Sequence, residues 1–251
     1  MTDSHCHLDR LKEPLAGIDP TLKAMVTVGT GPDRNDIALE LAADHPNVWA
    51  AIGIHPGDAT LAESDEVRRQ VSAQARHARV VAIGETGFDT HWDATSLEEQ
   101  QVAFDFQADL ARELNLPLIL HVRDRQGGRT ASAAACAALG QAGWQRGILH
   151  CFNGDEQLLE LGLELGWYVS FAGNVTYKSA ADLQEAARRV PAERLLFETD
   201  SPYLAPVPKR GRPNRPEYVR HTAEFVAGRR GVSYEELETV TDENAAAVFG
   251  F

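Results

Sequence analysis

The chain has 251 residues, of which 43% are hydrophobic, and it carries a formal net charge of −13 at pH 7. This length and apolar content suffice for one large core, and the acidic balance argues against a protein that coats nucleic acid through a broad basic surface. Three cysteines are too few for a disulfide framework, and neither a secretory signal nor a membrane-length apolar run is found, so we expect a cytoplasmic protein with no membrane partner.

Short apolar segments rich in β-branched residues alternate with longer amphipathic segments along the whole chain. This alternation is typical of repeated β-α units around a parallel sheet. Eight strands are predicted, at residues 2–7, 23–28, 48–54, 80–84, 117–122, 147–151, 167–171 and 195–199. The pattern predicts a single-domain α/β protein, a (β/α)8 (TIM) barrel that spans residues 1–251. The sequence does not set the oligomeric state, and a monomer is compatible with it.

Two helices carry clear start signals. Ser96 and Glu99 form a capping box that opens the helix predicted at 96–115, and Ser233 and Glu236 repeat this signature before the last helix. Residues 201–215, with several prolines and a glycine, are predicted to form an irregular loop before a helix that begins near Pro216. Loops of this length in compact domains are usually functional.

Residue types that bind metals occupy the predicted strands and their ends. His5 and His7 are two residues apart on the first predicted strand, so both imidazoles project from the same face of the strand and can hold one ion. Four further polar residues directly follow apolar runs: Glu85, His121, His150 and Asp200. The carboxyl ends of barrel strands converge on one pocket, so these six side chains are expected to meet. Four histidines and two carboxylates exceed the needs of one tetrahedral site, which favours two metal ions that share a carboxylate bridge.

Several motifs together resemble those of the TatD-type hydrolases, a branch of the amidohydrolase-like barrel superfamily, and the resemblance covers essentially the whole chain. The matching segments are Asp3-Ser-His-Cys-His-Leu-Asp9, Gly53-Ile-His-Pro56, Ile83-Gly-Glu-Thr-Gly-Phe-Asp89, His121-Val-Arg-Asp124, His150-Cys-Phe-Asn-Gly154, Glu198-Thr-Asp-Ser-Pro-Tyr-Leu-Ala-Pro206, Arg210-Gly-Arg-Pro-Asn214 and Asn244-Ala-Ala-Ala-Val-Phe249.

The resemblance implies a role for each candidate metal ligand. His5, His7 and Asp200 correspond to ligands of one ion, His121 and His150 to ligands of a second ion, and Glu85 to the bridge. A glutamate at the bridging position favours the TatD branch over dihydroorotase-like enzymes, which use a modified lysine. Asp200 and Glu85 are the expected catalytic residues, with Asp200 orienting and deprotonating the attacking water. The ions are divalent, and Mg, Mn and Zn all remain open.

Substrate contacts are expected from the strand ends and from the long loop after Asp200. The candidates are His55, Arg123, Tyr203, Lys209, Arg210 and Arg212, with Arg215 at the end of the same loop. The cations of this loop can reach an anionic substrate. Hydrogen bonding at a strand end is an equally good explanation for His55. Cys6 and Cys151 are expected to point away from the metals, toward the helix layer, because side chains alternate along a strand.

Two segments depart from the family pattern. The family commonly continues its Gly-Leu-Asp with Tyr, whereas this chain has Gly87-Phe-Asp-Thr-His-Trp92. Trp92 and His91 either stack on a base or ring of the substrate, or Trp92 packs over the barrel rim. Arg125 replaces the usual alanine after the histidine-arginine-aspartate motif. These departures concern specificity and leave the metal chemistry unaffected.

The sequence therefore predicts a divalent-metal-dependent deoxyribonuclease that removes nucleotides from single-stranded DNA in the 3'-5' direction with a metal-activated water, with RNA as a further possible substrate. Direction and mode of cleavage are implied by the resemblance alone. One alternative is a hydrolase of amides or esters with the same site, such as an aminoacyl-tRNA deacylase. A second alternative is a non-catalytic, metal-stabilised binding protein.

Overall fold

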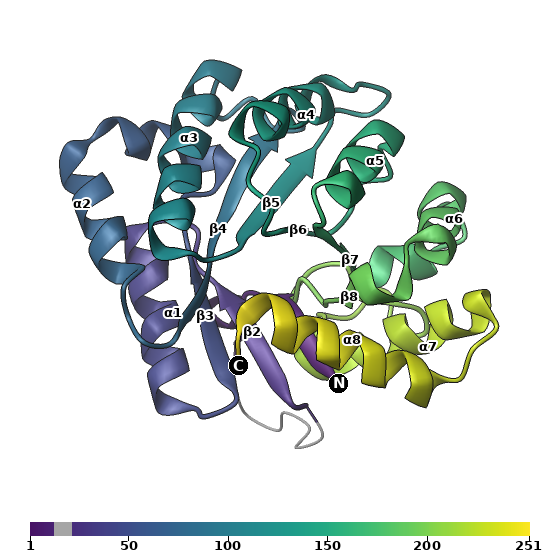
Figure 1. Cartoon of the computed structure of the whole chain (residues 1–251). Coiled ribbons are helices and arrows are strands. Elements are labelled where there is room, and N and C mark those ends of the chain that lie inside the picture. Colours follow the sequence, from purple (N-terminus) through teal and green to yellow (C-terminus); the bar gives the residue numbers. More distant parts are fainter. Residues whose placement is uncertain (13–21) are drawn as a thin grey trace.

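The computed structural model describes residues 1–12 and 22–251, and in them eight parallel strands alternate with helices (Figure 1). The strands are β1 (Thr2–Cys6), β2 (Ala24–Val28), β3 (Val48–Ile52), β4 (Val80–Asp89), β5 (Leu118–Arg123), β6 (Gly147–Leu149), β7 (Tyr168–Phe171) and β8 (Leu195–Phe197). They pair in chain order from β1 to β8. The predicted (β/α)8 barrel and all eight predicted strands are confirmed. The prediction that one domain spans 1–251 extends over residues 13–21, which lie outside the described residues.

The helices follow the strands around the barrel. They are α1 (Pro32–Asp44), α2 (Asp65–Gln74), α3 (Leu97–Leu114), α4 (Thr130–Ala142), α5 (Glu156–Glu164), α6 (Ala181–Arg189), α7 (Val219–Arg230) and α8 (Tyr234–Phe249). Short 3-10 helices η1 (Leu8–Arg10), η2 (Pro56–Glu63), η3 (Gly173–Thr176), η4 (Ala192–Arg194) and η5 (Pro216–Tyr218) lie between them. No helix in the described part of the chain is long and apolar enough to cross a membrane.

Both predicted capping boxes are present. Ser96 accepts a hydrogen bond from the Glu99 amide at the start of α3, and Ser233 accepts one from Glu236 at the start of α8. The helix predicted to begin near Pro216 begins there with η5, which runs into α7. The segment from 201 to 215 contains no helix or strand, as its prolines predict.

Apolar side chains form two buried layers. A large cluster lies between the strands and the helices, with Met25, Leu118 and Phe104 among its members. A smaller cluster takes the alternate residues of the strands, such as Val26 and Ile119, together with Val248 and Phe249 of α8. Because side chains of a parallel strand alternate between its faces, both faces of these strands are apolar.

The first strand and the segment directly after the last strand meet through side chains as well as backbone. The Asp3 carboxylate accepts hydrogen bonds from the amide of Thr199 (2.9 Å) and from its hydroxyl (2.6 Å). The Asp200 amide donates to the His5 carbonyl (2.9 Å), and the His7 amide donates to the carbonyl of Ser201 (2.9 Å). Together these bonds form the seam of the barrel, and they bring the ends of β1 and β8 together beside the candidate metal ligands.

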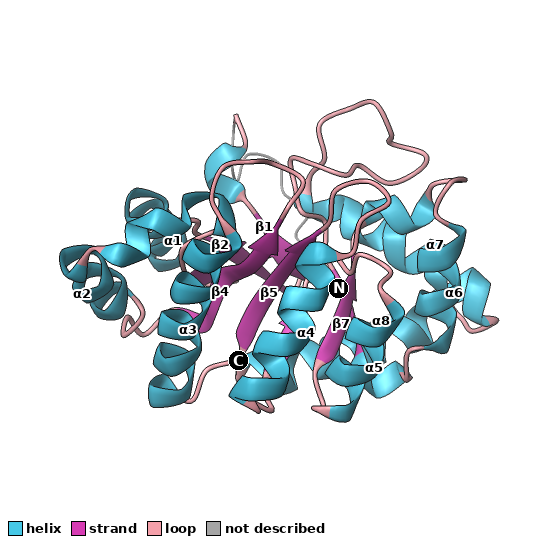
Figure 2. Cartoon of the chain, turned by 90° about the horizontal axis from the view of Figure 1, so that it is seen from above, coloured by secondary structure: helices cyan, strands magenta, loops and turns pink. Residues whose placement is uncertain are grey.

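Long loops project from one end of the barrel, as Figure 2 shows from above. Strand β4 is longer than the prediction, which ended it at Gly84, because it pairs with β5 as far as Asp89 and Arg123. Glu85 and His121 therefore lie inside strands, whereas His150 follows β6 directly. Polar side chains can occupy these strand positions because they face a cleft.

Candidate metal centre and substrate cleft

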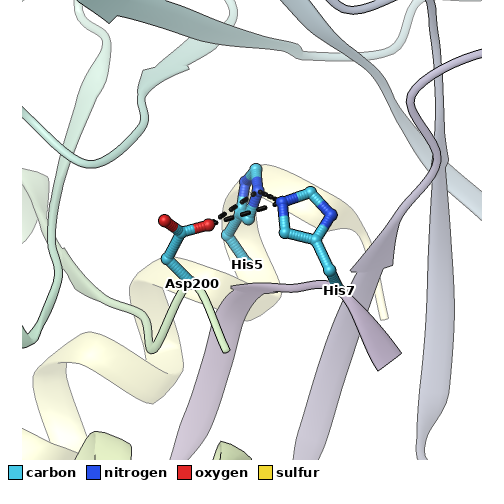
Figure 3. A group of neighbouring side chains, drawn as sticks. All are labelled: His5, His7 and Asp200. Atoms are coloured by element: carbon cyan, nitrogen blue, oxygen red, sulfur yellow. Dashed lines mark hydrogen bonds and ion pairs between the residues drawn. The ribbon is translucent and has the colours of Figure 1, made fainter. Parts of the chain in front are cut away.

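One group of candidate ligands joins the two sides of the seam. His5 and His7 project from β1, and Asp200 approaches them from the segment after β8 (Figure 3). The Nε2 atoms of the two histidines are 3.3 Å apart, and Asp200 Oδ1 lies 3.4 Å from Nε2 of His7 and 3.8 Å from Nε2 of His5. Ligand atoms at Zn–N bond lengths around a tetrahedral ion are separated by about 3.4 Å. The three donor atoms therefore fit around one ion.

Glu85 divides its two oxygens between two sets of histidines. Its Oε2 atom lies 3.6 Å from Nε2 of His5 and 3.7 Å from Nε2 of His7. Its Oε1 atom lies 2.5 Å from Nδ1 of His121 and 3.2 Å from Nε2 of His150. Glu85 is 3% exposed, so this carboxylate is enclosed by imidazoles. Oε2 thus faces the two histidines of β1, and Oε1 faces His121 and His150, with Nε2 of His55 further away at 3.9 Å. This division of the two oxygens is compatible with a bridging ligand.

In three of the imidazole rings, the nitrogen that does not face the other candidate ligands lies close to a carboxylate or a carbonyl oxygen. Nδ1 of His7 lies 3.1 Å from the carbonyl of Val28, and Nε2 of His121 lies 3.1 Å from Asp89 Oδ2. Nδ1 of His150 lies 2.8 Å from Oε1 of Glu198, which is fully buried. Such partners of the second ring nitrogen fix the orientation of metal-binding histidines.

The roles of Asp89 and Glu198 were missed from the sequence, although both lie in motifs that match the family. Asp89 is four residues after Glu85 and Glu198 is two residues before Asp200. Even spacing along a strand places Asp89 on the same face as Glu85, and this spacing is the signal that could have identified Asp89. Glu198 lies after β8 and Asp200 has a positive φ of 55°, so strand alternation gives no such signal there.

Burial and charge set opposite protonation tendencies within the histidine group. Burial lowers the pKa of His121, but the Glu85 and Asp89 carboxylates outweigh this effect and raise the pKa to about 9. Burial, aided by the charge of His150, holds the pKa of His5 well below its usual value. Burial raises the pKa of Glu85, but the surrounding histidines hold it well below the usual range. Glu85 is therefore ionised and ready to bind cations.

His55 lies on the wall of the same site. Its Nδ1 atom accepts a hydrogen bond from the Gly57 amide (2.9 Å), and burial lowers its pKa to about 4. The ring is therefore neutral with its proton on Nε2, which faces Glu85 Oε1 at 3.9 Å. A protonated Nε2 donates a hydrogen bond, so this geometry favours the expected contact with substrate over a role as metal ligand.

A cleft of about 800 Å³ opens over these residues. Of the substrate contacts expected from the sequence, His55, Arg123 and Tyr203 line it. Lys209, Arg210 and Arg212 are not among its lining residues: Lys209 lies over the Tyr218 ring and Arg210 over the ring of Tyr177. Arg10, Asn153 and Asn174 also line the cleft and were not anticipated.

Cys6 and Cys151 were both expected to face the helix layer, but only Cys6 does so. Cys6 is fully buried and its thiol donates to the Val26 carbonyl, as expected for a packed residue. Cys151 instead lines the cleft, which corrects the prediction that it faces the helix layer. The chain has already left β6 at this point, and the positive φ of Cys151 (41°) turns its side chain out of the alternation.

Gly87 allows β4 to approach β5 closely beside the site. Its φ is +138°, and a Cβ atom at this position would lie 2.1 Å from the carbonyl oxygen of His121. Only glycine is compatible with both the conformation and the contact. This residue therefore maintains the spacing between the strands that carry Glu85 and His121.

A model of the family described as TatD related DNase matches residues 2–250. The chain belongs to the TatD family. It is 39% identical to the uncharacterized metal-dependent hydrolase YcfH of Escherichia coli, over 99% of this chain and 95% of that protein. It is 36% identical to the 3'-5' ssDNA/RNA exonuclease TatD of Pantoea vagans, over 99% of this chain and 96% of that protein. These similarities make this TatD-family protein a metal-dependent hydrolase, and the non-catalytic alternative has no support.

A solved structure gives the same result for the fold. The TatD homologue YJJV of Escherichia coli superposes with a TM-score of 0.85 at 27% identity, covering 100% of this chain and 98% of that chain. The barrel of this TatD-family hydrolase is therefore shared along its whole length, including the strands that carry the six candidate ligands.

Proposed function

We propose that this hydrolase cleaves phosphodiester bonds of single-stranded nucleic acid, with DNA as its main substrate, and that it removes nucleotides from the 3' end. The observation that carries the proposal is the open cleft over a cluster of imidazoles and carboxylates divided by Glu85. The name of the Pantoea vagans relative supports the choice of substrate and direction.

We assign two divalent ions, Mg, Mn or Zn, to this cluster. His5, His7 and Asp200 would hold one ion, His121 and His150 the other, and Glu85 both. When bound, such ions activate water and neutralise charge on a phosphodiester. The donor set fits them, because both imidazole and carboxylate donors converge and three rings are already oriented by buried partners.

Asp200 is the proposed proton acceptor. Its Oδ1 atom faces the two histidines of β1, whereas the other oxygen points away from them (Figure 3). That free oxygen can orient a water molecule and take its proton. His55, through its protonated Nε2, and Arg123, from the cleft wall, would contact the phosphate, and Tyr203 would cover the nucleotide.

The proposed location is a reducing cytoplasm, because all three cysteines are free and a protein without disulfides does not depend on an oxidising compartment.

A substrate screen tests the proposal. Metal-stripped protein is reconstituted separately with Mg, Mn and Zn and given single-stranded DNA labelled at the 5' end, duplex DNA, RNA and an ester or aminoacyl substrate. We expect a ladder of 5'-labelled products that shorten one nucleotide at a time on single-stranded DNA, and slower cleavage of the duplex. Hydrolysis of the acyl substrates without any phosphodiester cleavage would overturn the proposal.

A further inference from the structure

Two exposed aromatic side chains stand on the rim of the cleft. Trp92 is 61% exposed and Tyr203 is 48% exposed, and both line the cleft. Trp92 is the most exposed of the large hydrophobic side chains in residues 1–12 and 22–251. Two exposed aromatic rings on the rim of one cleft provide faces on which a flat ligand can stack.

Asp89 attaches this tryptophan to the candidate metal centre. Its Oδ1 atom accepts hydrogen bonds from the amides of His91 (2.8 Å) and Trp92 (3.3 Å), and its Oδ2 atom lies 3.1 Å from Nε2 of His121. The His91 ring then packs edge-to-face against the indole, with centroids 4.7 Å apart. The backbone that carries the indole is therefore held close to Glu85 and the histidines, and the ring itself contacts His91.

Arg123 lies between Trp92 and a hollow next to the cleft. Its guanidinium lies 5.8 Å from the centroid of the Trp92 ring, and the residue lines both the cleft and a neighbouring hollow of about 440 Å³. Arg123 has no carboxylate partner in the described part of the chain. Its charge is therefore available to a ligand that passes from the cleft into the hollow.

The hollow lies between the loops that follow β5 and β6. Its wall includes Arg125, the glycine pair Gly127 and Gly128, and Asn153. The Arg125 amide donates to the hydroxyl of Thr90, which ties this loop to the segment that carries Trp92. The Arg125 guanidinium is 63% exposed and pairs with an aspartate, Asp93, that is 89% exposed, a contact that a phosphate can replace.

The acidic residues of the hollow are already engaged. Asp124 accepts hydrogen bonds from the Ala131 amide and the Ser132 hydroxyl at the start of α4, and Asp155 pairs with Arg129. Of the two cations on the wall, Arg123 has no carboxylate partner in the described residues, and Arg125 pairs with the exposed Asp93 alone. The hollow thus suits an anion, although the protein as a whole is acidic.

We infer that Trp92, Arg123 and the hollow beyond them form a second nucleotide subsite, in which the base next to the scissile bond stacks on Trp92 and the following phosphate enters the hollow toward Arg125. This inference rests on the proposed nuclease function and specifies its substrate. A base can lie on an indole only when it is unpaired, so the subsite selects single strands of at least two nucleotides.

Tryptophan fluorescence and binding provide the first test. The probe is a short phosphorothioate-linked oligothymidylate, which resists cleavage, titrated into the metal-loaded enzyme. We expect it to quench the fluorescence of the wild type, with the quench lost in Trp92→Phe. Trp92→Leu should weaken binding by about 5- to 150-fold, the usual effect of losing one stacked base. Removal of the base at the flanking position should make wild type and Trp92→Leu bind alike.

Trp49 offers a matched control. It lies on β3, partly exposed, with the Phe251 ring stacked on it and the Arg79 guanidinium 3.8 Å from its centroid. Trp49→Phe should therefore keep the wild-type quench and affinity. Arg125→Ala should reduce the log-log salt slope of binding by about 0.7, as for one lost phosphate contact on a single strand. An unchanged affinity in Trp92→Leu, or a quench that survives Trp92→Phe, would overturn the inference.

Catalysis separates this inference from the function on which it rests. A nitrophenyl ester of thymidine monophosphate has one nucleoside and cannot occupy both subsites. Trp92→Leu should reduce kcat/KM on both substrates to different extents: we expect the fold-reduction on oligonucleotides to be at least about five times the fold-reduction on this ester. If wild type cleaves both substrates and Trp92→Leu loses equally on each, the subsite is wrong and the nuclease stands. If wild type cleaves neither with any metal, the proposed function itself fails.

Discussion

Glu85 is the residue on which both halves of the candidate metal centre depend. Its Oε1 atom faces His121 and His150, and its Oε2 atom faces His5 and His7. Replacement by alanine removes a ligand from each proposed ion and leaves their mutual repulsion unscreened. Glu85→Ala should therefore reduce the content of both ions after dialysis, as measured by elemental analysis. Retention of two ions per folded chain would show that this carboxylate is not a bridge.

In the proposed mechanism Asp200 both binds a metal ion and accepts a proton, and an amide can replace only part of this role. Asp200→Asn keeps the volume and one oxygen but cannot accept a proton. We expect a normal circular dichroism spectrum and a loss of cleavage rate of about 100- to 10,000-fold, the usual contribution of a general base. Single-turnover cleavage at saturating metal measures the chemical step. A rate within a few-fold of wild type would exclude Asp200 as the base.

Several of these residues could be predicted from the sequence and others could not. The six candidate ligands follow from polar residues placed on or directly after apolar strands. The spacing of Asp89 from Glu85 indicates a shared strand face, but the ring nitrogen that Asp89 or Glu198 approaches is seen only in the side-chain geometry, so neither role was predicted. Cys151 was placed wrongly because one left-handed residue ended the alternation on which the prediction depended.

At the scale of elements, the alternation of apolar and amphipathic segments was sufficient to predict all eight strands but not their lengths. Glu85 was treated as the residue after a strand, yet β4 continues to Asp89 by pairing with β5. The path of the 201–215 loop was not predictable either. Long-range bonds fix it, for example those from the Asn214 side chain to the carbonyls of Thr199 and Tyr203.

Helix α3 fixes the positions of site residues through buried glutamines. The Gln100 side chain accepts a hydrogen bond from the Asp89 amide (3.0 Å) and donates one to the Asp89 carbonyl (2.9 Å). Gln107 makes the same pair of bonds to Ile54, the residue before His55. Through Asp89 and Ile54 the helix thereby positions the partner of His121 and the candidate substrate contact His55, and the rings of His121 and His55 both lie beside Oε1 of Glu85.

Gln100→Leu should test this role. It leaves the amide and carbonyl of Asp89 without partners in a buried position, which is expected to lower the free energy of unfolding by about 1–3 kcal/mol. Gln101→Leu, one residue further along the same helix and pointing at the exposed Asp105, should cost less than about 0.5 kcal/mol. Urea denaturation compares the two variants. Equal effects would mean that the bonds to Asp89 do not stabilise the protein.

At the scale of the whole molecule, metal ions should stabilise the folded barrel, because the unfolded chain cannot bring these ligands together. One ion at a hundredfold excess over its Kd contributes about 2.7 kcal/mol, so chelation should lower the Tm by about 5–10 °C. Calorimetry with and without a chelator measures the shift, and Glu85→Ala should show a much smaller one. A Tm that does not respond to chelation in the wild type would contradict metal binding at this cluster.

The seam between β1 and β8 adds a kinetic consequence. The residues that close it, Asp3 and Thr199, are separated by 196 positions along the chain. Bringing them together costs much conformational entropy because the loop between them is long, so this contact is expected to form late in folding. His5, His7 and Asp200 lie on its two sides. An ion held between them must depart before the first and last strands can separate. Metal binding would therefore mainly lower the rate of unfolding, and the dissociation rate of the ion would set how fast the closed barrel opens.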